Sequence, residues 1–272
     1  MKNPHGNEVD MLKHHEESLR IMVDHFKKNP DVLAVVFGGS VAKGCERANS
    51  DLDAMIIITE EAYRLRTESN TTTETIHGLC TYEGGYFDVK YMTKEYLISA
   101  AEKGSEPTRS SFASSRVMYT TDAEIPDIVN RIPVFQESEY EDKMLSFFSD
   151  FWLNYYYFWK SCPLDDFMKV HVINEVVYSI YRMILQQNHM LFPCNRRLGE
   201  YITQAADTPE GITVLAAELI SRMDNDSMDA FVNAFLQWSK YKGPEDISHV
   251  LSRYTNDFEQ WWRVPRPLIA EW

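Results

Sequence analysis

The sequence predicts an α/β (α+β) protein, and two observations carry this prediction. Before about residue 135, short runs of β-branched and aromatic residues alternate with segments of helical periodicity. From Glu139 onward, apolar residues recur at intervals of three and four, which is typical of helices alone. The chain has 272 residues, 44% of them hydrophobic, and is long enough to bury two cores. We therefore expect two domains, residues 1–135 and 136–272.

The first half is expected to mix strands and helices. Glu83, Gly84 and Gly85 separate two of the strands and indicate a hairpin. The expected elements are, in order, a helix over residues 8–29, a strand over 32–37, a helix opening at Ser40, strands over 52–58, 75–82, 86–92 and 115–121, and a short helix after Pro126.

The second half is expected to form a bundle of about five or six helices. Proline and glycine residues separate them, at Pro163, Pro193, Pro209, Gly243 and Pro244. The segment FFSDFWLNYYYFWK, residues 147–160, is too aromatic for an exposed helix. It is either the spine of the bundle, the lining of a ligand pocket or a subunit interface, so a homodimer stays open.

Composition restricts the partners that we expect. The formal net charge of −14 disfavours a nucleic-acid partner, because proteins that bind nucleic acids neutralise the phosphates with lysine and arginine. The first residues are polar and no segment approaches the ~20 apolar residues of a membrane span, so we expect a cytoplasmic protein without a membrane segment. The cysteines show no metal-binding spacing and are expected to be reduced: Cys45, Cys80, Cys162 and Cys194.

The stretch VVFGGSVAKGCERANSDLDAMIIIT, residues 35–59, holds the strongest functional signal. Gly38 and Gly39 follow a hydrophobic strand, and their missing side chains let a ligand approach the main chain. Main-chain N–H groups at a helix N-terminus, together with the Ser40 hydroxyl, suit a phosphate group. A tight turn with an N-cap serine is the alternative interpretation.

Three aspartates change that balance. Asp51 and Asp53 are two residues apart on an expected strand, so their side chains share a face and repel one another unless a cation is bound. Paired carboxylates suit Mg²⁺, which prefers oxygen ligands and accompanies phosphates. Asp88 lies in another expected strand and is a third ligand or a solvent-facing residue. Three carboxylates could hold two Mg²⁺ ions and a nucleoside triphosphate together.

The combination of GGS, ten intervening residues, DLD and a later DV resembles the signature of the nucleotidyltransferase superfamily typified by DNA polymerase β. The resemblance implies a small mixed β-sheet with flanking helices, here followed by an all-helical bundle. It also implies ATP or another NTP as co-substrate and Mg²⁺, with two ions, as cofactor.

The same resemblance assigns roles to individual residues. Asp51, Asp53 and Asp88 would be the catalytic carboxylates and the metal ligands. The triphosphate would be held by Gly39 and Ser40. Residues at the positions of Lys43 and Ser50 lie near the phosphates in many members, although here they could be a helix-surface lysine and a turn serine.

The helical half is similar, more loosely, to the second domain of antibiotic nucleotidyltransferases, particularly the lincosamide and aminoglycoside adenylyltransferases. Scattered aromatic residues, a lysine and an arginine between residues 148 and 202 carry this likeness. It implies transfer of a nucleoside monophosphate, AMP from ATP, to a hydroxyl of a small molecule, with release of pyrophosphate and a role in antibiotic resistance. Residues 1–135 would be the catalytic domain and 136–272 the acceptor-binding domain.

Several assignments stay open at this stage. Lys160 and Arg182 could reach the triphosphate or be paired elsewhere. The general base could be Asp88, Asp150 or Glu175. An acidic, aromatic cleft would suit a cationic acceptor such as an aminoglycoside, although a host metabolite would fit equally.

Two other functions are compatible with the sequence. The chain could be a catalytically silent nucleotide-binding or regulatory protein, although all three aspartates are present. Arg182 and His189, separated by six residues, resemble the arginine-to-histidine pair of HEPN-type ribonucleases, but Met183 stands where those enzymes usually have a polar residue. His14 and His15 are interpreted as exposed helix residues.

Overall fold

The computed structural model describes residues 11–263, in which the chain forms two compact units. The sheet unit contains the described residues up to Val134, except residues 105–107. The helical unit contains these three residues and the chain from Phe135 onward. The change in sequence pattern near residue 135 therefore lies beside this division, while the roles of the two domains stay predictions.

The sheet unit contains a mixed five-stranded sheet, which confirms the predicted fold class. The strands lie in the order β3-β4-β2-β1-β5. β2 is parallel to β4, whereas β1 is antiparallel to β2 and β5, and β3 is antiparallel to β4. Their bounds are β1 Val32–Phe37, β2 Leu52–Ile58, β3 Thr73–His77, β4 Tyr86–Met92 and β5 Arg116–Thr120.

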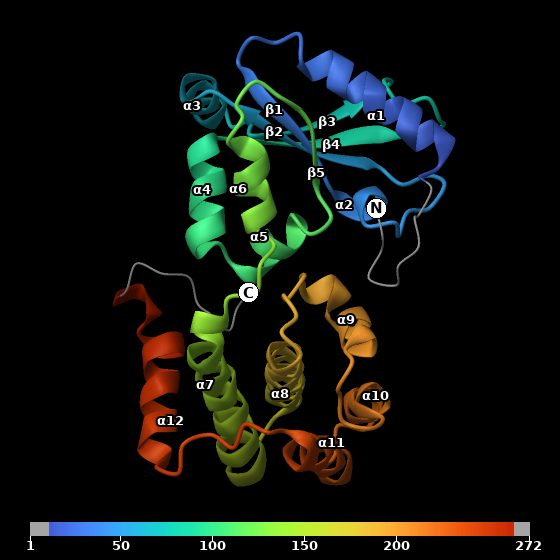
Figure 1. The fold of residues 1–272 in the computed structure, drawn as a ribbon. Coiled ribbons are helices and arrows are strands. Elements are labelled where there is room, and N and C mark those ends of the chain that lie inside the picture. Colours follow the sequence, from blue (N-terminus) through green and yellow to red (C-terminus); the bar gives the residue numbers. More distant parts are fainter. Residues whose placement is uncertain (1–10, 264–272) are drawn as a thin grey trace. The chain divides into compact units, whose positions relative to one another are not determined.

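Helices cover both faces of this sheet (Figure 1). On one face, Leu52, Ala54 and Ile56 of β2 pack with helix α1, Lys13–Phe26. On the other face, Met55 and Ile57 pack with α4, Lys94–Lys103, and α6, Ile125–Arg131. Side chains alternate along a strand, so a residue's position in the sequence decides which core it joins.

The remaining helices of this unit are short connections. They are α2, Gly39–Ala42, and α3, Glu60–Glu68. A third short helix, α5, Glu106–Ser111, begins in residues 105–107 of the helical unit and ends in the sheet unit. The helix predicted to open at Ser40 is therefore a single turn. The predicted strand over residues 75–82 is shifted, because β3 ends at His77 and a loop runs from Gly78 to Gly85. Helices α3 and α4 begin after Thr59 and Thr93, whose side chains cap them.

The helical unit has six α-helices among the described residues. They are α7, Tyr140–Trp152, α8, Asp166–Gln187, α9, Leu198–Gln204, α10, Ile212–Arg222, α11, Asn225–Trp238, and α12, Ile247–Tyr254. Two π-helical turns extend α7 and α12, over Leu153–Trp159 and Thr255–Glu259. Single 3₁₀ turns lie at Glu137–Glu139, Asn195–Arg197 and Trp261–Arg263.

The aromatic segment over residues 147–160 forms much of the core of this unit. Phe147, Phe151 and Trp159 are buried against α8 and α11, whereas Tyr156 and Tyr157 are exposed. One stripe of the segment is thus the spine of the bundle. The four cysteines are free. Among the described residues, no helix has the length and the apolar run that crossing a membrane requires.

Candidate functional site

The structure brings the three predicted aspartates together at one end of the sheet. Asp53 and Asp88 are direct partners in the parallel pairing of β2 with β4. Asp51 immediately precedes β2, and its side chain lies on the same face as that of Asp53. One carboxylate oxygen of each residue lies within 4.8 Å of the others. All three side chains are half-buried. The register of two parallel strands, and not sequence proximity alone, assembles this acidic group.

The electrostatics of this group favour a bound cation. Burial raises the pKa of Asp53 above its ordinary value, and the charges of Asp51 and Asp88 raise it further. Lys90 and Lys43 oppose this effect only in part, since the net shift is upward. A divalent cation would remove the repulsion and satisfy the carboxylate oxygens. The donor set of three carboxylates with converging oxygens fits Mg²⁺, and this set contains no sulfur or imidazole ligand.

Gly39 is packed directly beside this acidic group. Its φ is +72°, a left-handed conformation that favours glycine. A Cβ atom at this position would lie 1.7 Å from Oδ2 of Asp53. The N–H of Gly38 donates to the carbonyl oxygen of Asp53 at 3.1 Å, which ties the turn to β2. Glycine is required here for both the backbone angle and the close approach of the Asp53 carboxylate.

The other predicted binding residues flank the turn and the aspartates. Ser40 follows Gly39 within the single-turn helix α2, so main-chain donors and not a long helix dipole would serve an anion here. Lys43 donates from Nζ to the carbonyl oxygen of Ser110 at 3.1 Å, and its charge also acts on Asp53. The Ser50 hydroxyl accepts from the N–H of Arg47 at 2.8 Å, as a turn serine does.

Residues that the sequence interpretation missed hold the segment leading into Asp51. The Tyr82 hydroxyl donates to the carbonyl oxygen of Ser50 at 2.5 Å, and Nε2 of His14 lies 2.9 Å from the carbonyl oxygen of Ala48. The Tyr86 hydroxyl hydrogen-bonds Asp51, whose charge raises the pKa of Tyr86. The sequence signal for these supporting residues was the position of Tyr82 and Tyr86 on either side of the glycine pair Gly84-Gly85.

The interpretation of His15 as an exposed residue is wrong. Its side chain is fully buried and packs against Tyr82, with ring centroids 5.0 Å apart. Burial lowers the pKa of His15, and the neighbouring His14 lowers it further. The helical period of α1 places His15 on its buried face together with Ser18, Leu19 and Met22. The spacing of three and four residues in the sequence was the signal for this burial.

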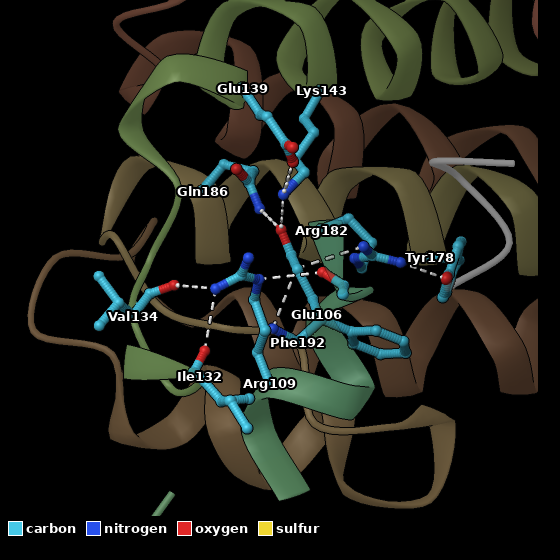
Figure 2. Close-up of polar contacts among 11 residues, drawn as sticks. Glu106, Arg109, Ile132, Val134, Glu139, Lys143, Tyr178, Arg182, Gln186 and Phe192 are labelled. Atoms are coloured by element: carbon cyan, nitrogen blue, oxygen red, sulfur yellow. Dashed lines mark hydrogen bonds and ion pairs between the residues drawn. The ribbon is translucent and has the colours of Figure 1, made fainter. Parts of the chain in front are cut away.

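Arg182, considered above as a phosphate ligand, is a buried structural residue of the helical unit. Its guanidinium is 1% exposed and lies 3.3 Å from Oε2 of Glu106 (Figure 2). It donates to the Tyr178 hydroxyl and stacks on the Phe147 and Phe192 rings. These contacts with Glu106, Tyr178 and the two aromatic rings account for the position of Arg182 without a ligand.

Lys160 and His189 also have partners within the helical unit. Nζ of Lys160 lies 2.5 Å from Oδ1 of Asp229. Nδ1 of His189 lies 2.7 Å from Oε1 of Glu137, and its ring stacks on Tyr140. With Arg182 enclosed in its pair with Glu106, no observation among the described residues favours the ribonuclease alternative.

The comparisons with known proteins relate this chain to solved structures. No protein-family model matches the chain, and no curated protein matches it significantly. Among solved structures, it is similar to a nucleotidyltransferase-like protein from Exiguobacterium sibiricum, with 9% identity, a TM-score of 0.45, and coverage of 93% of this chain and 81% of that chain. It is also similar to spectinomycin adenyltransferase AAD(9) from Enterococcus faecialis, crystallised with ATP and spectinomycin.

The second likeness has 14% identity and a TM-score of 0.32, and covers 91% of this chain and 97% of that chain. Both likenesses have low sequence identity and TM-scores below 0.5. At these identities and TM-scores, the chemistry of the chain rests on its own residues.

Proposed function

We propose that the protein transfers a nucleoside monophosphate, AMP from ATP, to a hydroxyl group of a small molecule and releases pyrophosphate. The observation that carries this proposal is the group of three converging carboxylates, Asp51, Asp53 and Asp88, packed against the Gly39 turn. A group of converging carboxylates in which the pKa of Asp53 is raised, next to a glycine turn, suits a metal–triphosphate ligand.

Asp51, Asp53 and Asp88 would hold Mg²⁺. When bound, the ions would neutralise the triphosphate and lower the pKa of the attacking hydroxyl. Tyr86 and Tyr82 would keep Asp51 and the peptide before it in place. These supports act before the ligand arrives, so the carboxylates need little rearrangement to bind.

In the transfer step, the acceptor oxygen forms a bond to the α-phosphorus while the bond between this phosphorus and the bridging oxygen of the pyrophosphate breaks. Pyrophosphate leaves with the electron pair of that bond. The acceptor hydroxyl gives its proton to a base, for which Asp88 is our candidate, because it belongs to the carboxylate group. The turn of Gly39 and Ser40 would orient the phosphates for in-line attack.

The first experiment is thermal unfolding of the purified protein with each of the four NTPs, with and without Mg²⁺. We expect a Mg²⁺-dependent rise in Tm, since a ligand that binds only the folded state stabilises it by mass action. The double variant Asp51→Asn/Asp53→Asn should lose this rise. Asp127→Asn, an exposed aspartate on α6, is the matched control and should keep it.

A second assay follows pyrophosphate release with aminoglycosides and lincosamides as acceptors. Either Asp51→Asn or Asp53→Asn should abolish the release while leaving the fold intact, because the substitution relieves mutual repulsion. If a folded variant kept near-normal turnover, the metal-ligand assignment would be wrong. If the wild-type protein bound no NTP at millimolar concentration, the catalytically silent alternative would replace this proposal.

A further inference from the structure

The helical unit contains a cavity whose lining includes none of the residues that we propose to bind Mg²⁺ and ATP. Its volume is about 460 Å³, and every residue that lines it belongs to this unit. The wall is built from the end of α7, the middle of α8 and the π-helical turn after α12. A cavity of this size can hold one small organic molecule.

A buried carboxyl group lies in the wall of this cavity. Asp150 is 2% exposed, and its two oxygens accept hydrogen bonds from Nδ2 of Asn154, at 2.9 Å, and from the Ser179 hydroxyl. Both donors are neutral. Among the described residues, no ion pair is recorded for Asp150, although a buried carboxylate normally requires one. Burial, the largest cause, and the charge of Glu175 together raise the pKa of Asp150 to about 8, so the group holds its proton at neutral pH.

The rest of the wall is acidic and aromatic. Glu175, on α8, is half-buried, and together with Asp150 it acts on Tyr254, whose pKa burial raises to about 12. Nδ1 of His171 lies 3.9 Å from Glu175, but the histidine is exposed and stands at the rim. No lysine or arginine occurs among the described residues that line the cavity. The cavity therefore offers two carboxyl groups without a permanent counter-charge.

Aromatic rings complete the wall. The rings of Tyr254 and Phe258 are stacked, with centroids 4.8 Å apart and an interplanar angle of 16°, and Tyr178 adds a third ring. Ring faces attract ammonium groups and also cover the carbon skeleton that carries them. Asn174 and Asn195 add amide groups that can hydrogen-bond hydroxyl or amino substituents.

We propose that this cavity binds a small organic molecule that carries a protonated amine. The ammonium group lies at Asp150 and Glu175, and the carbon skeleton lies against Tyr254 and Phe258. The inference is independent of the proposed nucleotidyl transfer, because the helical unit alone supplies the lining residues. The same chemistry fits an amine-bearing acceptor or an amine that acts as an effector, and the test separates these two sources.

Binding of the ammonium group has a measurable consequence for Asp150. A cation beside the carboxyl group favours its ionised form, so binding near pH 7 should release a proton. The titratable groups that line the cavity together with Asp150 are Glu175, Tyr178 and His171 on α8, and Tyr254 on α12. Of these, the tyrosines stay neutral at pH 7. Burial and, to a smaller extent, the charge of Glu175 keep the proton on Asp150 in the free protein.

The test is titration calorimetry of the full chain without nucleotide. The probes are 2-deoxystreptamine, an aminocyclitol, and cyclohexylamine, each with an uncharged counterpart, myo-inositol and cyclohexanol. We expect the amines to bind and the uncharged counterparts to bind at least about tenfold more weakly, a difference of about 1.4 kcal/mol. Titration of an amine in two buffers of different ionisation enthalpy should show the release of a proton.

Variants identify the groups that are responsible. Glu175→Gln should weaken amine binding at least about tenfold, and Asp150→Asn should weaken it and abolish the proton release. Glu218→Gln, an exposed glutamate on α10 away from the cavity, should bind the amines as the wild type does. Glu175 is half-buried, so its variant remains informative even if Asp150→Asn folds poorly.

Equal binding of the amines and their uncharged counterparts, or unchanged amine affinity of Glu175→Gln, would overturn the proposal. Once binding is established, transfer assays identify the source of the amine. An acceptor becomes nucleotidylated, and Glu175→Gln raises its KM. An effector changes the rate with another acceptor and is recovered unmodified. Failure of all nucleotidyl transfer would leave the calorimetric result intact, so the two proposals fail separately.

Discussion

Two carboxyl groups buried in the helical unit, Glu106 and Asp150, lie in opposite electrostatic environments. Glu106 is 3% exposed and meets Arg182 and Lys143, its Oε1 lying 3.0 Å from Nζ of Lys143 (Figure 2). Gln186 and the N–H of Phe192 also donate to it. Asp150 has only neutral donors, from Asn154 and Ser179.

The pKa values follow from this difference. Burial alone would raise the pKa of Glu106, but the charges of Arg182 and Lys143 lower it below its ordinary value. The pKa of Asp150 rises to about 8 because no such charge opposes burial. A buried acid with its counter-charges is part of the framework, whereas a buried acid without them, beside a cavity, is a candidate binding group. Asp53, beside Gly39, also has a raised pKa, because burial and the charges of Asp51 and Asp88 outweigh those of Lys90 and Lys43.

The largest effect is expected from removing the paired acid. Glu106→Gln leaves Arg182 buried without its counter-charge and leaves Lys143 with Glu139 alone, and should lower the free energy of unfolding by about 3–5 kcal/mol. Urea unfolding followed by circular dichroism measures this loss. Glu139→Gln is the control, because Glu139 is the exposed partner of Lys143 and should contribute only about 0–1 kcal/mol. Equal losses in the two variants would contradict our interpretation of Glu106.

The next effect concerns the acidic group of the sheet unit. Gly39→Ala should destabilise the fold by about 2–3 kcal/mol, because alanine meets both a positive φ and the Asp53 carboxylate. Gly84→Ala is matched to it, since Gly84 has a φ of +76° but no heavy atom within 4 Å of the added Cβ. Gly84→Ala should lower the free energy of unfolding by about 1 kcal/mol, because only the cost of a positive φ for alanine applies there. Urea unfolding of both variants tests whether the close approach to Asp53 contributes.

Asp150 gives a pH dependence of the opposite sign to that of a paired acid. Its pKa is raised on folding, so its stabilising contribution is complete below the ordinary pKa of an aspartate and is lost as the pH rises through about 8. Asp150→Asn should remove this decline. The variant should gain stability relative to the wild type between pH 5 and pH 9, in Tm measurements across that range. Parallel Tm curves for the two proteins would show that the carboxyl group is not held protonated.

The smallest effect is expected at the tyrosine that holds the Ser50 carbonyl. Tyr82→Phe removes one hydrogen bond and should lower the free energy of unfolding by about 0.5–1.5 kcal/mol. Because Ser50 precedes Asp51, we also expect a lower kcat in the transfer assay with a smaller change in KM for the nucleotide. The exposed Tyr96→Phe on α4 should change neither quantity. A stability loss without any kinetic change would limit Tyr82 to a structural role.

The sequence by itself determined the alternation of strands and helices, the helical second half and the glycine turn followed by two aspartates. These features are local: strands alternate every second residue, helices repeat at three and four, and glycine is identified by the conformations it permits. β1, β2 and β4 were predicted with their observed bounds for this reason.

Only the tertiary structure decided which distant groups meet. The pairing of Asp53 with Asp88 depends on the register of two parallel strands, and burial of Glu106 with Arg182 depends on contacts across 76 positions of the chain. The opposite states of Glu106 and Asp150 could not be read from residue type, since both are acids in apolar surroundings. Desolvation and neighbouring charge set a pKa, and both depend on packing that a linear pattern does not specify.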